Sequence, residues 1–262
     1  MKCLCFYVSV IFFSLMAMPS SAQRSLKVMS YNIHHCNPPS KPDLIDVDAI
    51  AKAISKQQPD LVALQEVDVN TGRSGRIDEA VLLAQKTGMK AFYFAKAIDH
   101  DGGDYGVAIL SKYPLSETQT FRLPMDSATK GERRVLAQAV VTLPNGQKII
   151  FASTHLDAQK QPTNRLLQIE AINKISGGYK LPYIIGGDFN AEQHSEVIKI
   201  LDKKFVRTCS DCKPTIPVIN PRKAIDFLAF KRGGHFKVIH HEVVDESYAS
   251  DHLPIVAQLE LK

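Results

Sequence analysis

The sequence predicts a mixed α/β fold in which two β-sheets pack together and helices cover their outer faces. Apolar, strand-like runs alternate with amphipathic helical patterns, and they are numerous enough to need two layers of sheet or a barrel. An Asn145-Gly146 turn between two of these runs predicts an antiparallel hairpin. The chain has 262 residues, of which 45% are hydrophobic and 23% charged, a composition typical of one globular domain with a sizeable core.

Strands are expected where β-branched, aromatic and other apolar residues dominate between turn residues. These runs cover residues 26–33, 60–67, 105–111, 137–143, 148–156, 183–190, 224–230, 236–244 and 255–261. Helices are expected where apolar residues recur every three or four positions after a residue that can cap a helix. The expected apolar faces are Val47, Ile50, Ala51 and Ile54 after Asp46; Val81, Leu82 and Ala84 after Asp78; and Leu167, Ala171, Ile172 and Ile175 after Asn164.

Residues 1–22 have the pattern of a secretory signal peptide. Lys2 precedes an apolar run from Leu4 to Met18, and small residues follow it. The run is short for a bilayer span, and Pro19 with the small residues favours cleavage after Ala22 over an uncleaved anchor. We therefore expect an exported protein, periplasmic or secreted, whose mature domain covers residues 23–262 and has no transmembrane segment.

The cysteines of the mature chain include one Cys-x-x-Cys pair, Cys209 and Cys212. Such a pair can be a redox site, half of a zinc site or a small disulfide loop. The sequence favours the disulfide, because it offers neither a second pair to complete a zinc site nor a thioredoxin-like βαβ context. Cys36 is expected to be a buried or partly buried free thiol, since no spacing marks it as a nucleophile.

Polar side chains recur where the predicted strands end, in "YNIHH", "LQEVD", "STHLD", "GGDFN", "IDF" and "SDHLP". One such residue is usually a cap or a turn, because Asn and Asp side chains bind nearby backbone. Acid, amide and imidazole groups at so many strand ends, flanked by apolar residues, need partners or a ligand. The pattern indicates one site at the rim of the sheets, and Gly186 and Gly187 are expected to give the tight turn that presents Asp188 and Asn190.

The ordered set of these motifs, together with "YGVAILSKYP", resembles the endonuclease/exonuclease/phosphatase superfamily, which includes deoxyribonuclease I, abasic-site endonucleases and inositol polyphosphate 5-phosphatases. The resemblance extends from about Lys27 to the C-terminus. It implies a deoxyribonuclease I-like four-layer sandwich, hydrolysis of a phosphate ester and a divalent cation, usually Mg²⁺ with Mn²⁺ as an alternative. The chemistry agrees, because a phosphodiester repels anionic nucleophiles, and its hydrolysis needs a cation on the phosphate and an activated water.

The resemblance also implies roles for particular residues. Glu66 would be the main metal ligand, Asn32 a second ligand or a brace for the phosphate, and Asp251 a further acidic contact to the metal or its waters. Asp188 would orient and deprotonate the attacking water. Asn190 would donate a hydrogen bond to the phosphate.

Histidines complete the implied site. Asp226 would fix the tautomer of His252, whose ring would stabilise the transition state, and His155 would contact the phosphate. For His34 and His35, strand alternation places one in the site and the other in the core, without ranking them. Four arginines are weaker candidates for phosphate contact: Arg73, Arg76, Arg133 and Arg134.

Charge and aromatic content bear on the substrate. The formal net charge is only +5, and the chain contains no Trp. Duplex binding normally uses a dense basic stripe, and single-strand binding uses aromatic residues among basic ones. Nucleic acid is therefore the second choice of substrate. The favoured reading is a monomeric Mg²⁺-dependent phosphoesterase acting on a small, sugar-linked or lipid-linked phosphate mono- or diester.

Two alternative functions follow from the same residues. The first is a secreted endonuclease that acts on DNA or RNA. The second, a catalytically silent binding protein, is disfavoured because the acidic, amide and imidazole residues of the implied site are all present: Glu66, Asp188, Asn190, Asp226 and His252.

Overall fold

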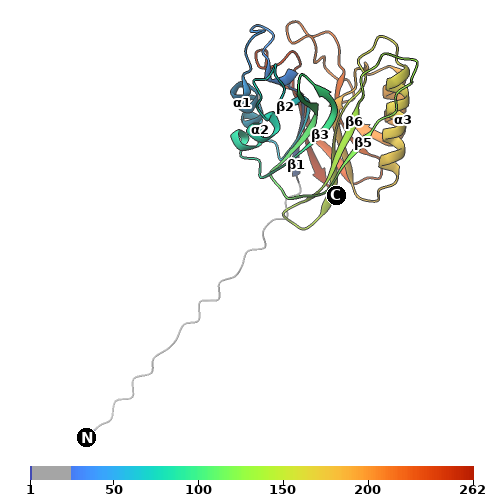
Figure 1. Ribbon diagram of the computed structural model, residues 1–262. Helices are drawn as coiled ribbons and strands as arrows, with labels where there is room; N and C mark the ends of the chain where they lie inside the picture. Colours follow the sequence, from blue (N-terminus) through green and yellow to red (C-terminus); the bar gives the residue numbers. More distant parts are fainter. Residues whose placement is uncertain (2–24) are drawn as a thin grey trace.

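The computed structural model describes residue 1 and residues 25–262, and the latter form two packed six-stranded β-sheets with helices on their outer faces (Figure 1). This four-layer arrangement confirms the predicted fold class. Residues 2–24, and with them nearly all of the expected signal peptide, lie outside the described residues, so the signal peptide stays a prediction. Within residues 25–262, the helices are too short or too polar to cross a membrane.

The first sheet has the strand order β11-β12-β1-β2-β4-β3. Strands β1 and β2 run parallel, whereas the other neighbouring strands are antiparallel. Helices α1 and α2 cover its outer face (Figure 1). The bounds are β1 (Ser25–Asn32), α1 (Val47–Gln57), β2 (Leu61–Val69), α2 (Glu79–Thr87), β3 (Ala91–His100), β4 (Gly103–Ser111), β11 (Phe236–Val243) and β12 (Ile255–Leu261).

The second sheet has the strand order β5-β6-β7-β8-β10-β9. Strands β7 and β8 run parallel, and the other neighbours are antiparallel, including the β6–β7 hairpin predicted at Asn145-Gly146. Helices α3 and α4 cover its outer face. The bounds are β5 (Leu115–Arg122), β6 (Val135–Thr142), β7 (Lys148–His155), α3 (Thr163–Gly177), β8 (Tyr183–Asp188), α4 (Glu196–Lys204), β9 (Phe205–Arg207) and β10 (Asp226–Lys231).

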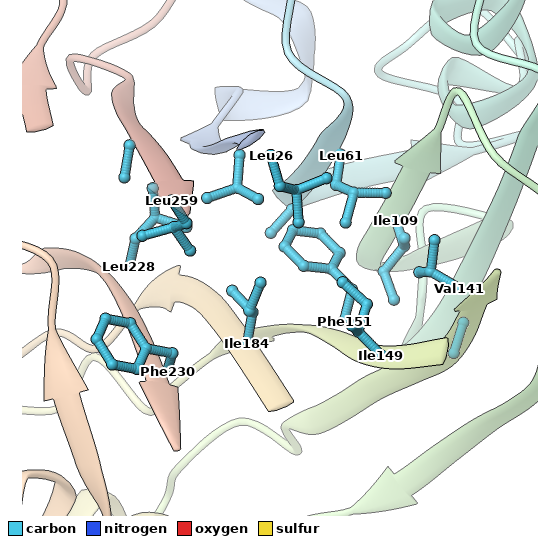
Figure 2. Close-up of a cluster of buried hydrophobic side chains, with 14 of the residues drawn as sticks. Leu26, Leu61, Ile109, Val141, Ile149, Phe151, Ile184, Leu228, Phe230 and Leu259 are labelled. Atoms are coloured by element: carbon cyan, nitrogen blue, oxygen red, sulfur yellow. The ribbon is translucent and has the colours of Figure 1, made fainter. Parts of the chain in front are cut away.

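Strand alternation divides the buried side chains into three layers. In β2, Leu61 points between the two sheets, whereas its neighbour Val62 packs beneath α1 and α2. Figure 2 shows the layer between the sheets, where Leu26 and Leu61 of the first sheet face Phe151 and Ile184 of the second. This layer fixes the two sheets against each other, and with them the strand ends that carry the polar motifs.

The glycines before Asp188 have a different role from the one expected. Gly186 and Gly187 lie inside β8, and neither has a positive φ. A Cβ on Gly186 would lie 2.9 Å from the Cβ of Ala63 in the other sheet, and a Cβ on Gly187 would lie 2.5 Å from the backbone oxygen of Thr154. The prediction of a tight turn was wrong, since these glycines allow close packing between sheets and between strands.

Two helices begin where the sequence predicted them to begin, and one does not. Asp46 and Asp78 cap α1 and α2 as predicted. Helix α3 begins after Pro162, so Asn164 is buried inside its first turn and Leu167 is 38% exposed. The expected apolar face is confirmed for Ile172, which is buried, and for Ala171 and Ile175, which pack against the core, but it was wrong for Leu167. Helix α3 also buries several polar side chains that bind neighbouring loops.

The cysteine predictions are confirmed. Cys209 and Cys212 form a disulfide with an S–S distance of 2.02 Å, and Cys36 is a buried free thiol. Burial raises the pKa of the Cys36 thiol, which keeps it protonated and unreactive.

Candidate active site

Strands from both sheets end at one rim and bring polar side chains together there. Asn32 ends β1, His155 ends β7 and Asp188 ends β8. Asp226 begins β10, and because β10 is antiparallel to β8, it lies at the same rim. The pairing sets His155 beside Asp188 and Asp188 beside Asp226, so these three residues form one row across the second sheet.

A β-bulge places Glu66 in the site. The pairing of β2 with β4 shifts between Gln65 and Val67, and Glu66 between them has a φ of 57°. The two flanking residues are fully buried, whereas Glu66 is half-buried. The extra residue therefore turns the Glu66 carboxylate to the rim, where it accepts a hydrogen bond from the Asn32 side-chain amide at 3.0 Å.

Asp188 lies at the centre of the site and is 1% exposed. Its Oδ1 accepts the backbone N–H of Asn190 at 2.8 Å, and its Oδ2 accepts the Asn32 amide at 3.1 Å. The same Oδ2 lies 3.5 Å from His155 Nε2 and 3.7 Å from His252 Nε2. Burial, and then the repulsion of Asp226, raise the pKa of Asp188 to about 7. A carboxylate with this pKa suits proton transfer near neutral pH.

His252 is paired with Asp226. Its Nδ1 lies 2.9 Å from Asp226 Oδ2, which also accepts the Thr215 hydroxyl. Burial alone would lower the pKa of His252, but Asp226 and Asp188 outweigh it and raise the pKa to about 10. The ring is therefore held as a cation in a fixed orientation beside Asp188.

His155 is enclosed by donors. Arg134 Nη1 lies 3.1 Å from His155 Nδ1, and because a guanidinium only donates, Nδ1 accepts and the ring proton is on Nε2. Burial, Arg134 and His252 lower the pKa of His155 well below its usual range, so the ring is neutral. Its Nε2 faces Asp188 and lies 3.0 Å from the side-chain nitrogen of Asn190. That nitrogen donates a hydrogen bond to the backbone oxygen of Leu156.

The four candidate arginines lie in different surroundings. Arg134 is buried against His155, a contact that the sequence analysis did not anticipate, and Arg133 is exposed beside a separate pocket. Arg73 binds the buried Asp68 through Nε at 2.7 Å and Nη2 at 2.9 Å. Arg76 donates to the backbone carbonyl groups of Asn70 and Gly102. The last two thus hold the loop between β2 and α2.

The predicted split of His34 and His35 between site and core was wrong. Strand β1 ends at Asn32, and the two histidines lie in a short 3-10 turn, η1 (His34–Cys36), with φ values of 46° and 42°. Strand alternation therefore does not apply to them. Both are half-buried near Glu66, and burial together with Arg73 lowers the pKa of His35 to about 4.

Within the described residues, two groups of side chains bring possible metal-ligand atoms to within 4.8 Å of one another. They are His34, His35 and Glu66 in one group and Asp188, Asp226 and His252 in the other. Asp251 belongs to neither group, and its Oδ1 lies 3.4 Å from the Ser250 hydroxyl, which donates to the Asn32 backbone oxygen. The half-buried Glu66 carboxylate beside the Asn32 amide offers the oxygen ligands that divalent cations take, so the site fits such an ion.

Known proteins share this sequence pattern and fold. Residues 29–252 match the model of the Endonuclease/Exonuclease/phosphatase family. Human nocturnin is 25% identical over 252 residues, which cover 79% of this chain and 56% of nocturnin, so the chain spans about half the length of that relative.

Solved structures give the same result for the fold. An endonuclease/exonuclease/phosphatase from Beutenbergia cavernae superposes with a TM-score of 0.77 at 22% identity and covers 91% of this chain and 72% of that one. A mannosyl-6-phosphatase from Bacteroides thetaiotaomicron has a TM-score of 0.71 at 18% identity, with coverage of 89% and 99%. The chain belongs to the endonuclease/exonuclease/phosphatase family.

Proposed function

We propose that this protein is a divalent-metal-dependent phosphoesterase that hydrolyses a phosphate mono- or diester. The observation that carries the proposal is the surroundings of Asp188. A buried carboxylate accepts hydrogen bonds from Asn32 and Asn190 and lies within 3.7 Å of two imidazole rings. The cation, Mg²⁺ or Mn²⁺ at Glu66, would offset the charge that develops on the phosphate oxygens.

Three side chains have separate roles in the proposed reaction. Asp188 orients a water molecule and takes its proton, for which a pKa near 7 is suitable. His252, held as a cation by Asp226, stabilises negative charge on the phosphate. The side-chain NH₂ of Asn190 lies beside the neutral ring of His155 and donates one proton to the backbone oxygen of Leu156, which leaves its second proton for a phosphate oxygen.

The substrate is proposed to be small and linked to a sugar or a lipid. A pocket of about 420 Å³ adjoins Asn190, and it is lined in part by Lys160, Arg165 and Lys223. This volume suits a small organic phosphate. A solved structure with the same fold is named a mannosyl-6-phosphatase, which supports a sugar phosphate as the first class to test.

Export of the protein is also proposed. It rests on the sequence of residues 1–22, where an apolar run after Lys2 ends in small residues. Expression of the full chain with a C-terminal tag, followed by fractionation and N-terminal sequencing, tests it. A mature protein that begins at residue 23 outside the cytoplasm supports export, and an uncleaved protein in the cytoplasm refutes it.

The catalytic proposal is tested with a substrate panel. Purified protein lacking residues 1–22 is assayed with bis-p-nitrophenyl phosphate, p-nitrophenyl phosphate, mannose 6-phosphate, sphingomyelin and plasmid DNA, each with EDTA and with added Mg²⁺ or Mn²⁺. We expect hydrolysis of a small phosphate ester that EDTA abolishes and that the Asp188→Asn variant lacks. Hydrolysis of plasmid DNA alone would establish the endonuclease instead. Hydrolysis that persists in EDTA would contradict the metal requirement.

A further inference from the structure

Two histidines to which the proposed reaction assigns no role lie beside Glu66. One ring nitrogen of His34, one of His35 and a carboxylate oxygen of Glu66 all lie within 4.8 Å of one another. Ligands on opposite sides of one ion are roughly 4.2 Å apart when each metal–ligand distance is about 2.1 Å. The three atoms are thus close to the spacing of ligands around a single ion.

The backbone that presents these side chains is in an unfavourable conformation. His34, His35 and Cys36 are three consecutive residues with φ between 42° and 55°, and Glu66 has a φ of 57°. Left-handed backbone is costly for residues other than Gly and is found preferentially at functional sites. Here it turns both imidazole rings and the carboxylate toward one point, from the end of β1 and from the bulge in β2.

The hydrogen bonding of the His34 and His35 rings also leaves a nitrogen of each ring able to bind a metal ion. His34 Nδ1 lies 2.9 Å from the backbone oxygen of Asn37. A carbonyl oxygen only accepts, so Nδ1 carries the proton and Nε2 keeps a free lone pair, which is the usual arrangement of a metal-binding histidine. His35 Nδ1 is buried and has no hydrogen-bond partner within the described part of the chain. A buried imidazole nitrogen without a partner is costly unless it binds something.

We infer that His34 and His35 add imidazole nitrogen ligands to the cation held at Glu66, and that the site therefore selects a first-row transition ion over Mg²⁺. This inference deepens the proposed function and rests on its placement of the cation at Glu66. Oxygen ligands alone suit Mg²⁺, whereas imidazole favours ions such as Co²⁺ and Zn²⁺ and is accepted by Mn²⁺.

The first test detects the nitrogen ligands of the bound ion directly. Metal-free, tag-free protein is loaded with one equivalent of Mn²⁺, and pulsed electron paramagnetic resonance is used to detect ¹⁴N nuclei coupled to the ion. We expect imidazole nitrogen coupling in the wild-type protein. Bound Mn²⁺ without any nitrogen coupling would overturn the inference, and this result does not depend on whether a variant folds.

The second test compares affinities in variants. His34→Asn, His35→Asn and the double variant retain a residue type that tolerates left-handed backbone. We expect the double variant to lose nitrogen coupling and to bind Co²⁺ and Zn²⁺ at least tenfold more weakly, with a much smaller change for Mg²⁺. The control is His240→Asn, since His240 is an exposed histidine beside Glu242 on β11 and should affect no ion. An equal loss of affinity for Mg²⁺ and Co²⁺ would contradict the inference.

The experiments distinguish failure of the histidine-ligand inference from failure of the phosphoesterase proposal. Nitrogen coupling in a protein that hydrolyses none of the phosphate esters supports the histidine ligands and refutes the phosphoesterase. Mg²⁺-supported hydrolysis with Mn²⁺ bound by oxygen alone supports the phosphoesterase and refutes the histidine ligands.

Discussion

Replacement of Asp188 by Asn separates a catalytic role of this residue from a structural one. The change keeps the size of the side chain but removes its charge. Asp188 Oδ1 can still accept the Asn190 N–H, whereas the amide nitrogen at the Oδ2 position would face the Asn32 amide, also a donor. The variant therefore loses one hydrogen bond to a charged group, about 1.5–3 kcal/mol. It also relieves the burial of a carboxylate next to Asp226, which opposes that loss.

We expect the free energy of unfolding of Asp188→Asn to change by no more than about 2 kcal/mol, because these two effects partly cancel. The turnover number should fall by roughly two to four orders of magnitude, since an amide cannot take the proton from the attacking water. Steady-state kinetics and urea unfolding followed by circular dichroism measure the two quantities. The matched control is Asp48→Asn, an exposed carboxylate on α1 paired with Lys86. A folded Asp188→Asn with near-normal turnover would show that Asp188 only shapes the site.

Three further predictions concern the metal, pH and the cysteines. Glu66→Gln should raise the concentration of cation needed for half-maximal activity, and an unchanged metal titration would exclude Glu66 as a ligand. Burial and Asp68 raise the pKa of Glu79 to about 8. The proton on Glu79 therefore adds stability that is complete below the unfolded pKa of about 4.3 and is lost as pH rises to 8. Urea unfolding from pH 4 to 9 should show this loss in the wild-type protein and a smaller one in Glu79→Gln. Thiol labelling of the chain lacking residues 1–22 should detect no thiol in the native state, Cys36 alone after denaturation, and Cys209 and Cys212 as well after reduction. Labelling of three thiols without reduction would exclude the disulfide.

Most of the predicted strands are runs of consecutive buried residues, although β11, an edge strand with mostly exposed or half-buried side chains, was predicted as well. Strands β7 and β8 are buried along almost their whole length, so their apolar runs are uninterrupted. Strand β5 was missed because it lies at a sheet edge with mostly exposed side chains and reads as a polar segment. Strand β3, the edge of the other sheet, is half-buried, and it was missed although residues 91–95 are all apolar.

The candidate site, like the strands, was predicted only in part. The motifs predicted correctly that Asn32 and Asp188 end strands, whereas Glu66, also predicted at a strand end, lies inside β2. The side-chain amide of Asn32 donates hydrogen bonds to both acids. The bulge that turns Glu66 outward depends on the register between β2 and β4, which no local pattern specifies. The contact of Arg134 with His155 joins the start of β6 to the end of β7 and is set by their pairing. The adjacent dipeptide "RR" at residues 133–134 gave no signal that would distinguish its two members.

The position of Asn32 has a consequence for when activity can appear during synthesis. Its amide joins an acid of the first sheet, Glu66, to an acid of the second, Asp188. Its own strand, β1, pairs with β12, and His252 lies just before β12. A nascent chain whose residues 252–261 are still inside the ribosome has neither the ring that faces Asp188 nor the strand that fixes Asn32. The nascent protein should therefore remain inert toward phosphate esters until residues 252–261 have left the ribosome and β12 can pair with β1.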